Sequence, residues 1–270
     1  MLGAIIGDIV GSRFEFNNTN RKDFKLFTKE CDFTDDTICT VAVADAILHN
    51  KSFEDALREW CRKYPMCAYG GSFNAWLQTD TPQPYNSFGN GSAMRVSPCA
   101  LAASSDAEAI RLAIASASCT HNHPEGIIGA VATALVMRAL FANLGRTLSA
   151  SIDANSVIAT YYGEDWYKNL PRPGVFDVTC QGCVPLAFYI VDNSHSFEDA
   201  IRTAVAYGGD SDTLAAIVGS MAEASYPIPA SLYEQALSYL PKDMLAVIYD
   251  FEKIYNPTTD YINYLSKLLN

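Results

Sequence analysis

Two short segments of this 270-residue chain place neighbouring carboxylates and hydroxyls where apolar helices are expected to begin. Phe33-Thr34-Asp35-Asp36-Thr37 precedes one apolar run, and Gly208-Gly209-Asp210-Ser211-Asp212-Thr213 precedes another. Taken singly, each segment is explained by helix capping, because a hydroxyl accepts from a free backbone N–H and the acids complement the helix dipole. Neighbouring side chains point about 100° apart on a helix, so adjacent carboxylates reach one site only from the first turn.

Taken together, the two segments hold four aspartates, which is more acid than capping requires. If the two helices pack side by side, their carboxylates converge and repel one another unless they are protonated or bound to cations. Mg²⁺ and Mn²⁺ prefer oxygen ligands of this kind, and two such ions about 3.5–4 Å apart form a binuclear site. The acids therefore predict a pair of divalent cations.

The net charge of the chain is −11, which restricts its partners. A nucleic-acid duplex and an anionic membrane both select a basic face, so neither is an expected partner. An anionic substrate would need a positive field from another source. The bound metal ions, rather than Lys or Arg, are expected to supply it.

Three further features have both a structural and a functional explanation. The turn in SFGNGSAMR, residues 87–95, is typical of an anion cradle before a helix, although a plain turn and cap need the same residues. Phe88 could stack on a base or belong to the core. His121 and His123 lack partners at zinc-ligand spacing, so each is either exposed or capping, or else contacts the substrate. Glu15, between two phenylalanines, is uninformative alone.

Helical periodicity dominates the chain, and no run alternates as strands do. We expect an all-α, single-domain compact bundle over residues 1–270, with a long irregular loop at 79–90. Capping boxes begin helices at Ser52, Ser105 and Ser196. Helices are predicted over 2–10, 35–49, from 52, and over 92–103, 106–118, 124–144, 151–161, 180–192, 197–207, 212–224, 230–238 and 242–254.

Hydrophobic residues make up 49% of the chain, enough for a large core, so the eight cysteines are interpreted mainly as buried thiols. Cys180 and Cys183 form a lone C-x-x-C without a second pair for zinc, and a redox role has little support. The apolar stretch from Gly126 is interrupted by Arg138 and is interpreted as a buried helix rather than a membrane span. No secretory signal is visible, so a cytoplasmic location is expected.

The ordered set of motifs resembles the ADP-ribosylglycohydrolase family nearly from end to end. The resemblance depends on GAIIGDIVGSRFE, FTDDT, YGGSFNAWL, NSFGNGSAMRVSP, CTHNHPEGIIGA and YGGDSDTLAAIVGS. Each motif is common alone, but the ordered set is specific. It implies an all-α orthogonal bundle that holds two divalent cations, Mg²⁺ or Mn²⁺, with no departure at a metal position.

The resemblance also implies roles for individual residues. The metal ligands would be Thr34, Asp35, Asp36, Asp210, Asp212 and Thr213. Glu15 resembles the family's catalytic glutamate, and Asp36 is the second candidate for the base that takes a proton from water. The diphosphate and distal ribose would lie against Gly89, Asn90, Gly91, Ser92, Ala93 and Met94. His121 would contact a ribose or phosphate, and Phe88 is a weaker candidate for adenine stacking.

These residues predict an enzyme that cleaves the glycosidic bond between ADP-ribose and an acceptor, through an oxocarbenium-like state. The partner would be ADP-ribose or an ADP-ribosylated substrate. Arginine, serine, nucleobase and small-molecule acceptors all stay open, as does the oligomeric state. Two alternatives are a catalytically silent ADP-ribose-binding module and a binuclear-metal nucleotide phosphohydrolase, which would release AMP or phosphate.

Overall fold

The computed structural model describes residues 1–143 and 152–269, and helices are the regular elements of this part of the chain. Within it there is no strand, only an isolated bridge between Gly89 and Thr179. The elements are α1 (Leu2–Gly11), η1 (Ser12–Phe14), α2 (Asp35–His49), α3 (Phe53–Lys63), α4 (Gly71–Gln78), α5 (Gly91–Met94), α6 (Ser97–Ala102), α7 (Asp106–Ser118), α8 (Pro124–Asn143), α9 (Ala154–Tyr162), η2 (Trp166–Asn169), α10 (Cys180–Asp192), α11 (Phe197–Tyr207), α12 (Ser211–Glu223), α13 (Ala230–Leu237), α14 (Lys242–Tyr255) and α15 (Tyr261–Leu269). The all-α fold class is confirmed.

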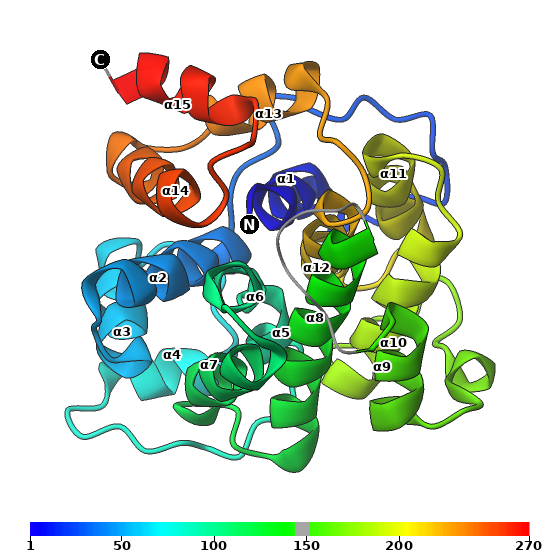
Figure 1. Cartoon of the computed structure of the whole chain (residues 1–270), viewed down its shortest axis with the longest axis horizontal. Coiled ribbons are helices and arrows are strands. Elements are labelled where there is room, and N and C mark those ends of the chain that lie inside the picture. The colour runs from blue at the N-terminus through cyan, green and yellow to red at the C-terminus, as the bar shows by residue number, and fades with distance from the viewer. Residues whose placement is uncertain (144–151, 270) are drawn as a thin grey trace.

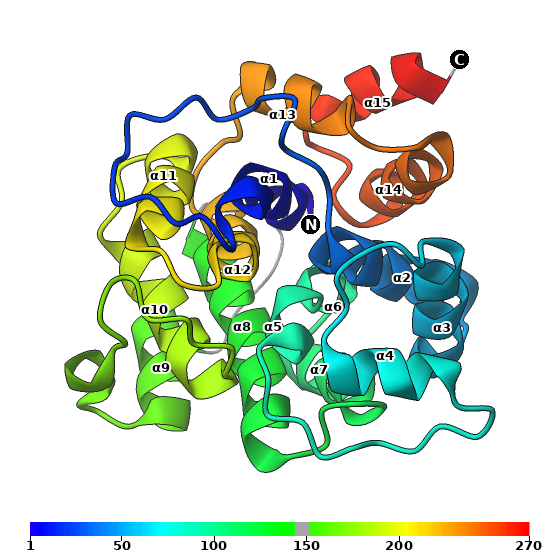
Figure 2. The ribbon, with the colours of Figure 1, turned by 180° about the vertical axis from the view of Figure 1, so that it is seen from behind.

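Helices α1 and α12 form the centre of the bundle, and the other helices surround them (Figures 1 and 2). Every residue of both helices is buried. A helix that is hydrophobic all round needs neighbours on every side. The second acidic segment, which begins α12, therefore lies in the interior of the molecule.

The backbones of α1 and α12 approach each other closely because glycines face the contact. A Cβ on Gly7 would lie 1.9 Å from the carbonyl oxygen of Ala215, and one on Gly11 would lie 2.5 Å from the Cα of Asp212. No side chain fits at these distances. The contact continues toward the end of α1, where the acids lie.

The predicted capping residues begin their helices. Ser52, Ser105 and Ser196 accept from the backbone N–H three residues on, at 3.0, 3.2 and 3.1 Å. Thr34 caps α2 and accepts from the N–H of Asp36 at 3.3 Å. The capping interpretation of the first acidic segment is thus confirmed. The same residues also belong to a larger cluster.

Several predicted boundaries were wrong. The helix expected over 92–103 is two short helices, α5 and α6, because the chain turns at Arg95–Val96 and Pro98 starts the second helix. Helix α9 begins at Ala154 rather than 151. Residues 144 and 151, where two predicted helices end and begin, lie outside the described residues. Helices α4 and α15 were not predicted.

Helix α8 is long and apolar enough to cross a membrane by length and composition, but most of its apolar window is buried inside the protein. It contacts α7 and α9, as expected of a core helix. The cysteines are free thiols, and most of them are buried. Cys180 and Cys183 lie in the first turn of α10, where their thiols donate to the backbone oxygens of Gly89 and Asp177.

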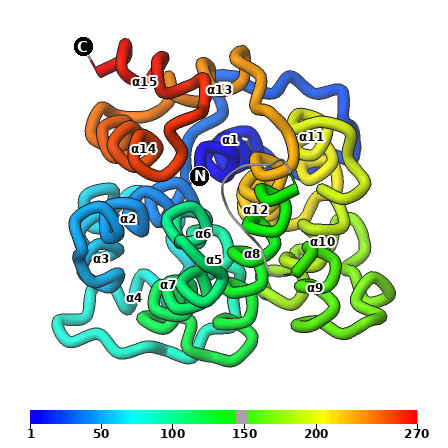
Figure 3. Tube along the Cα trace, in the orientation of Figure 1, coloured from blue at the N-terminus to red at the C-terminus, as the bar shows by residue number. Residues whose placement is uncertain are grey.

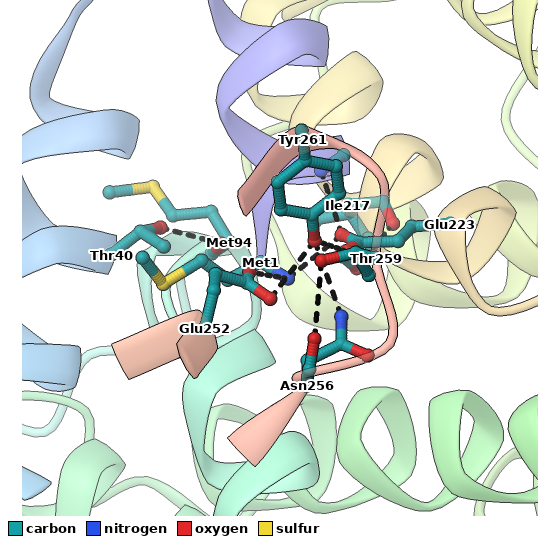
Figure 4. A network of polar contacts seen from close by, with 11 residues as sticks. Met1, Thr40, Met94, Ile217, Glu223, Glu252, Asn256, Thr259 and Tyr261 are labelled. Atoms are coloured by element: carbon teal, nitrogen blue, oxygen red, sulfur yellow. Dashed lines mark hydrogen bonds and ion pairs between the residues drawn. The ribbon is translucent and has the colours of Figure 1, made fainter. Parts of the chain in front are cut away.

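A group of buried charges lies where α1 begins, near the centre of the chain trace (Figure 3). The ammonium group of Met1 is 2.8 Å from Glu223 and 3.5 Å from Glu252. The Tyr261 hydroxyl lies 3.0 Å from Glu223 Oε1 and 2.9 Å from Glu252 Oε2, and it can donate its one hydrogen to either (Figure 4). Asn256 donates to the same hydroxyl. This network joins α1, α12 and α14 to the start of α15.

Candidate active site

Asp8, on α1, joins the first acidic segment to the centre of the bundle. It is fully buried, and its carboxylate accepts from the backbone N–H groups of Thr34 and Thr37 at 2.9 and 3.1 Å. The hydroxyls of both threonines also donate to it. A carboxylate with this many donors fixes how α2 begins against α1. The prediction had not included Asp8.

Asp36 and Asp212 bring the two predicted segments together. Ligand oxygens of Asp8, Asp36 and Asp212 all lie within 4.8 Å of one another. Thr213, on α12, donates its hydroxyl to Asp36 at 3.1 Å. One buried oxygen of Asp36 and one of Asp212 have no hydrogen-bond partner. Two helix starts separated by about 175 residues in sequence therefore meet in space.

Glu15, Asp210 and Asp212 form a second group, with ligand oxygens also within 4.8 Å of one another. Asp212 belongs to both groups, so the two are continuous. Asn90, from the glycine loop, donates to Asp210 at 2.6 Å. Asn18 donates to the backbone oxygen of Gly209 at 2.9 Å and accepts from its N–H at 2.7 Å. These contacts hold the turn before α12 against the segment that carries Glu15.

Burial and mutual repulsion raise the pKa values of these acids. Burial raises the pKa of Asp8 to about 6. Partial burial and the charges of Asp210 and Asp8 raise the pKa of Glu15 to about 7. Burial and the Asp8 charge raise the pKa of Asp35 to about 7 and that of Asp36 well above its usual value. The same causes, with Asp210 as the neighbour, raise the pKa of Asp212. An added cation would relieve the repulsion.

The acids open into a cavity of about 380 Å³. Its lining includes most of the predicted site: Glu15, Asp35, Gly89, Asn90, Gly91, Met94, His121, Asp210, Asp212 and Thr213. A volume of this size falls within the range of small-ligand sites. The cavity therefore joins the acidic residues at one end to the glycine loop and His121 at the other.

Three predicted substrate-binding residues do not line this cavity. Ser92 is buried and donates its hydroxyl to the backbone oxygen of Gly126 at 2.6 Å, which packs the glycine loop on α8. Ala93 is buried beside it. Phe88 is 46% exposed, and its ring meets His123 edge-on at 5.3 Å. Substrate contact by these three stays a prediction.

The cavity also contains residues that the sequence reasoning had missed. Tyr85 and Phe176 contribute rings to its lining, and Arg95 contributes a cation that is only 1% exposed. Tyr85 lies in the irregular 79–90 loop, whose length alone suggested a functional segment. Nothing in the sequence distinguished Arg95 from an ordinary helix residue.

The residues present fit a pair of hard divalent cations. The groups around Asp212 offer only oxygen atoms, which Mg²⁺ and Mn²⁺ prefer. The oxygens of Asp36 and Asp212 that lack partners are available as ligands. Across residues 1–143 and 152–269, no Lys or Arg is ion-paired with Asp8, Asp36 or Asp212, although 14 ion pairs occur elsewhere. Thr34 and Asp35 lie beside this cluster.

Comparison with known proteins gives the site its context. The sequence model of the ADP-ribosylglycohydrolase family matches residues 1–256 of this chain. The chain belongs to this family. It is thus an ADP-ribosyl glycohydrolase, as the motif resemblance predicted.

Individual ADP-ribosylglycohydrolases are similar to the chain at low identity. It is 26% identical to the ADP-ribosylarginine hydrolase Tri1 of Pseudomonas putida (strain GB-1), over 84% of this chain and 70% of that protein. It is 25% identical to the ADP-ribosylhydrolase ARH3 of Mus musculus, over 91% of this chain and 88% of that protein. A solved ADP-ribosylglycohydrolase-related protein complex shares the fold, with a TM-score of 0.66 at 22% identity, covering 94% of this chain and 97% of that one.

Proposed function

We propose that this ADP-ribosyl glycohydrolase depends on two divalent cations, Mg²⁺ or Mn²⁺, and releases ADP-ribose from a modified acceptor. The observation that carries the proposal is that acids from α1, α2 and α12 meet at Asp212, which lines one cavity together with the glycine loop and His121. The acids explain a cation site, and the loop and histidine explain a place for the phosphates. A cavity that served a nucleotide alone would not need so many buried carboxylates.

Asp8, Asp36, Asp210 and Asp212 supply the oxygens that would hold the ions, and Glu15 lies beside them. Bound there, the ions would act as a template and Lewis acid for the hydroxyls of the proximal ribose. Asp36 is held by Thr213, and Asp210 is held by Asn90, so both carboxylates are oriented before any ligand arrives.

Glu15 is our first choice for the residue that takes a proton from the attacking water. It is only partly buried and it lines the cavity, so its carboxylate can reach a water molecule there. Asp36 is fully enclosed, and one of its oxygens already accepts from Thr213. Glu15 is therefore the better placed of the two carboxylates to exchange a proton with water.

The test is a panel of defined substrates carrying ADP-ribose on arginine, serine, a nucleobase or a small molecule. We expect EDTA treatment to abolish turnover and either Mg²⁺ or Mn²⁺ to restore it, with intact ADP-ribose as the product. Release of AMP or phosphate would instead indicate a phosphohydrolase. Tight ADP-ribose binding without turnover of any substrate would indicate a silent binding module.

Asp210→Ala and Glu15→Ala belong in the same assay as the wild type. Both should lose turnover. Asp210→Ala should also weaken metal binding, whereas Glu15→Ala should retain ADP-ribose binding. Full turnover by both variants would contradict the proposal.

A further inference from the structure

Arg95 follows α5 and is a buried cation without a carboxylate partner in the described part of the chain. Its Nη2 donates to the backbone oxygen of Ser116 at 2.8 Å and to the hydroxyl of Thr120 at 2.9 Å. Its Nε has no hydrogen-bond partner. A buried, unpaired guanidinium is costly, so its retention beside a ligand cavity calls for an explanation.

Thr120 connects Arg95 to the next residue in the chain, His121. Its buried hydroxyl lies 2.7 Å from Nδ1 of His121. A hydroxyl has a single hydrogen, and its oxygen already accepts from Arg95. If Nδ1 carried a proton and donated to Thr120, the hydroxyl hydrogen would be left with the Cys119 sulfur, which is a weak acceptor. The arrangement that satisfies each group has Thr120 donating to a bare Nδ1.

The other ring nitrogen of His121 faces the glycine loop. A Cβ on Gly91 would lie 3.0 Å from Nε2, and one on Gly89 would lie 3.6 Å from it. The ring lines the cavity, and Nε2 has no protein hydrogen-bond partner in the described residues. The neutral ring must then carry its proton on Nε2, and this N–H points at a space kept open by two glycines.

We propose that Arg95 and Thr120 are positioning residues, which hold His121 in its neutral Nε2–H form so that this N–H donates to a diphosphate oxygen of the ligand. This inference rests on the proposed function for the identity of the ligand. The Arg95 charge behind the ring favours an anionic acceptor over a neutral one. Burial and Arg95 also lower the pKa of His121, in agreement with a neutral ring.

The same arrangement divides the cavity into two electrostatic ends. Carboxylates at the α12 end attract cations, whereas Arg95 and an obligatory N–H donor at the α5 end repel them and attract anions. A ligand with a diphosphate at one end and a ribose diol at the other is thereby oriented. Metals are not the sole source of positive field in this acidic protein.

The first experiment reads the tautomer directly. Nitrogen-15 spectra of the wild-type protein should show His121 with a bare Nδ1 and a protonated Nε2 at pH 7.5 (about one unit above the usual histidine pKa). The chain has four histidines, and the signal lost in His121→Gln assigns the correct one. In Thr120→Val the single tautomer should give way to a mixture, and Thr120→Ser should restore it. A wild-type ring protonated on Nδ1 would overturn the relay.

The second experiment measures ligand binding by calorimetry, with Mg²⁺ present. Thr120→Val should weaken ADP-ribose binding about tenfold or more and leave adenosine binding unchanged, because adenosine has no phosphate. Thr120→Ser should bind within about threefold of the wild type. Thr133→Val is the matched control, since Thr133 is equally buried and its hydroxyl has no partner.

The outcomes separate this inference from the proposed function. Equal losses for ADP-ribose and adenosine, or none for ADP-ribose, would overturn the diphosphate contact whatever the enzyme hydrolyses. Failure of the wild type to bind ADP-ribose would refute both the ligand and the contact. The tautomer measurement decides the role of Thr120 even if no substrate in the panel is turned over.

Discussion

The molecule buries two clusters of carboxylates, and they are neutralised in different ways. Glu223 and Glu252 lie around the ammonium group of Met1, and Tyr261 adds a donor. The aspartate cluster around Asp212 receives hydroxyl and amide donors but no ion-paired Lys or Arg in the described residues. One cluster thus carries its cation within the chain, whereas the other does not.

This difference separates a structural cluster from the candidate metal site. Buried carboxylates are tolerated when a charge of opposite sign lies nearby, and otherwise their pKa values rise until they take up protons. The glutamate cluster, at the far end of α12 from the site, is complete in the sense that it contains its own cation, although burial and the Glu223 charge still raise the pKa of Glu252. The aspartate cluster is complete only with protons or cations from solution, and a divalent ion is the ligand that its oxygens suit.

The largest effect is expected when a charge is removed from the incomplete cluster. In Asp212→Asn, kcat/KM should fall about a thousandfold or more, because both groups of ligands share Asp212 and ions at such sites contribute several kcal/mol to catalysis. Unfolding of the metal-free protein should not become easier, since a repelling charge is lost. Turnover, metal content and melting temperature measure this, with exposed Asp192→Asn as control. An Asp212→Asn variant that still binds metal and turns over substrate would show that the aspartate cluster does not depend on this carboxylate.

Removing a charge from the complete cluster should have the opposite profile. Glu223→Gln leaves the Met1 ammonium without its 2.8 Å partner, and breaking a buried pair costs about 3 kcal/mol of unfolding free energy. Denaturant titration measures the loss, and kcat of the folded fraction should stay near the wild-type value. A variant with wild-type stability would show that the two clusters do not differ as argued.

A smaller effect is expected from the acid at the edge of the incomplete cluster. Glu15→Gln keeps the size of the side chain but cannot accept a proton, so kcat should fall about a hundredfold. Metal and ADP-ribose binding should change little, because Glu15 is half-buried and four other carboxylates remain. The assay measures turnover as a function of pH. If Glu15→Gln turned over at the wild-type rate, Asp36 would become the candidate for the base that takes the proton from water.

The smallest effect concerns pH and the metal-free protein. The folded pKa values of Asp8, Glu15 and Asp35 rise to about 6, 7 and 7, above ordinary values near 4. The folded state therefore binds more protons than the unfolded state between about pH 4 and 7, and stability is lost as pH rises through this window. EDTA-treated protein should melt at a higher temperature at pH 5 than at pH 8.

Added Mg²⁺ or Mn²⁺ should reverse this trend, because cations replace the lost protons. At a concentration about ten times Kd, either ion should add about 1.4 kcal/mol at pH 8, with less effect at pH 5. Ca²⁺ and high NaCl serve as controls for general ionic effects. Equal stabilisation by NaCl would indicate screening rather than binding.

The sequence predicted helices better than it predicted their contacts. The capping serines and the first-turn aspartates are local signals, so Ser52, Ser105 and Thr34 were placed correctly. Helix α4 has no capping side chain before it, and α15 was missed although Thr259 and Asp260 precede it. The predicted helix over 92–103 ignored the turn before Pro98. Local chemistry decides where helices begin, but a short helix without a cap is stabilised by packing, which sequence does not show.

Asp8 shows where the site itself escaped prediction. It is the lone charge on a helix that is otherwise apolar, and such a residue must have partners when buried. That signal was present in the sequence. Arg95 and Thr120 gave no comparable signal, because their importance depends on which groups surround them once α5, α7 and α8 are assembled.

The glycine contact between α1 and α12 has a consequence for how the enzyme can vary. Asp8 and Asp212 are carried by two backbones in direct contact, so their separation is fixed by peptide geometry and not by adjustable side chains. Exchanges among the outer helices can be absorbed without altering that separation. Adding a single methyl group at Gly7 should force Asp8 and Asp212 apart and weaken the binding of a divalent ion between them. The close contact of α1 with α12 would therefore determine which ionic radius the site accepts.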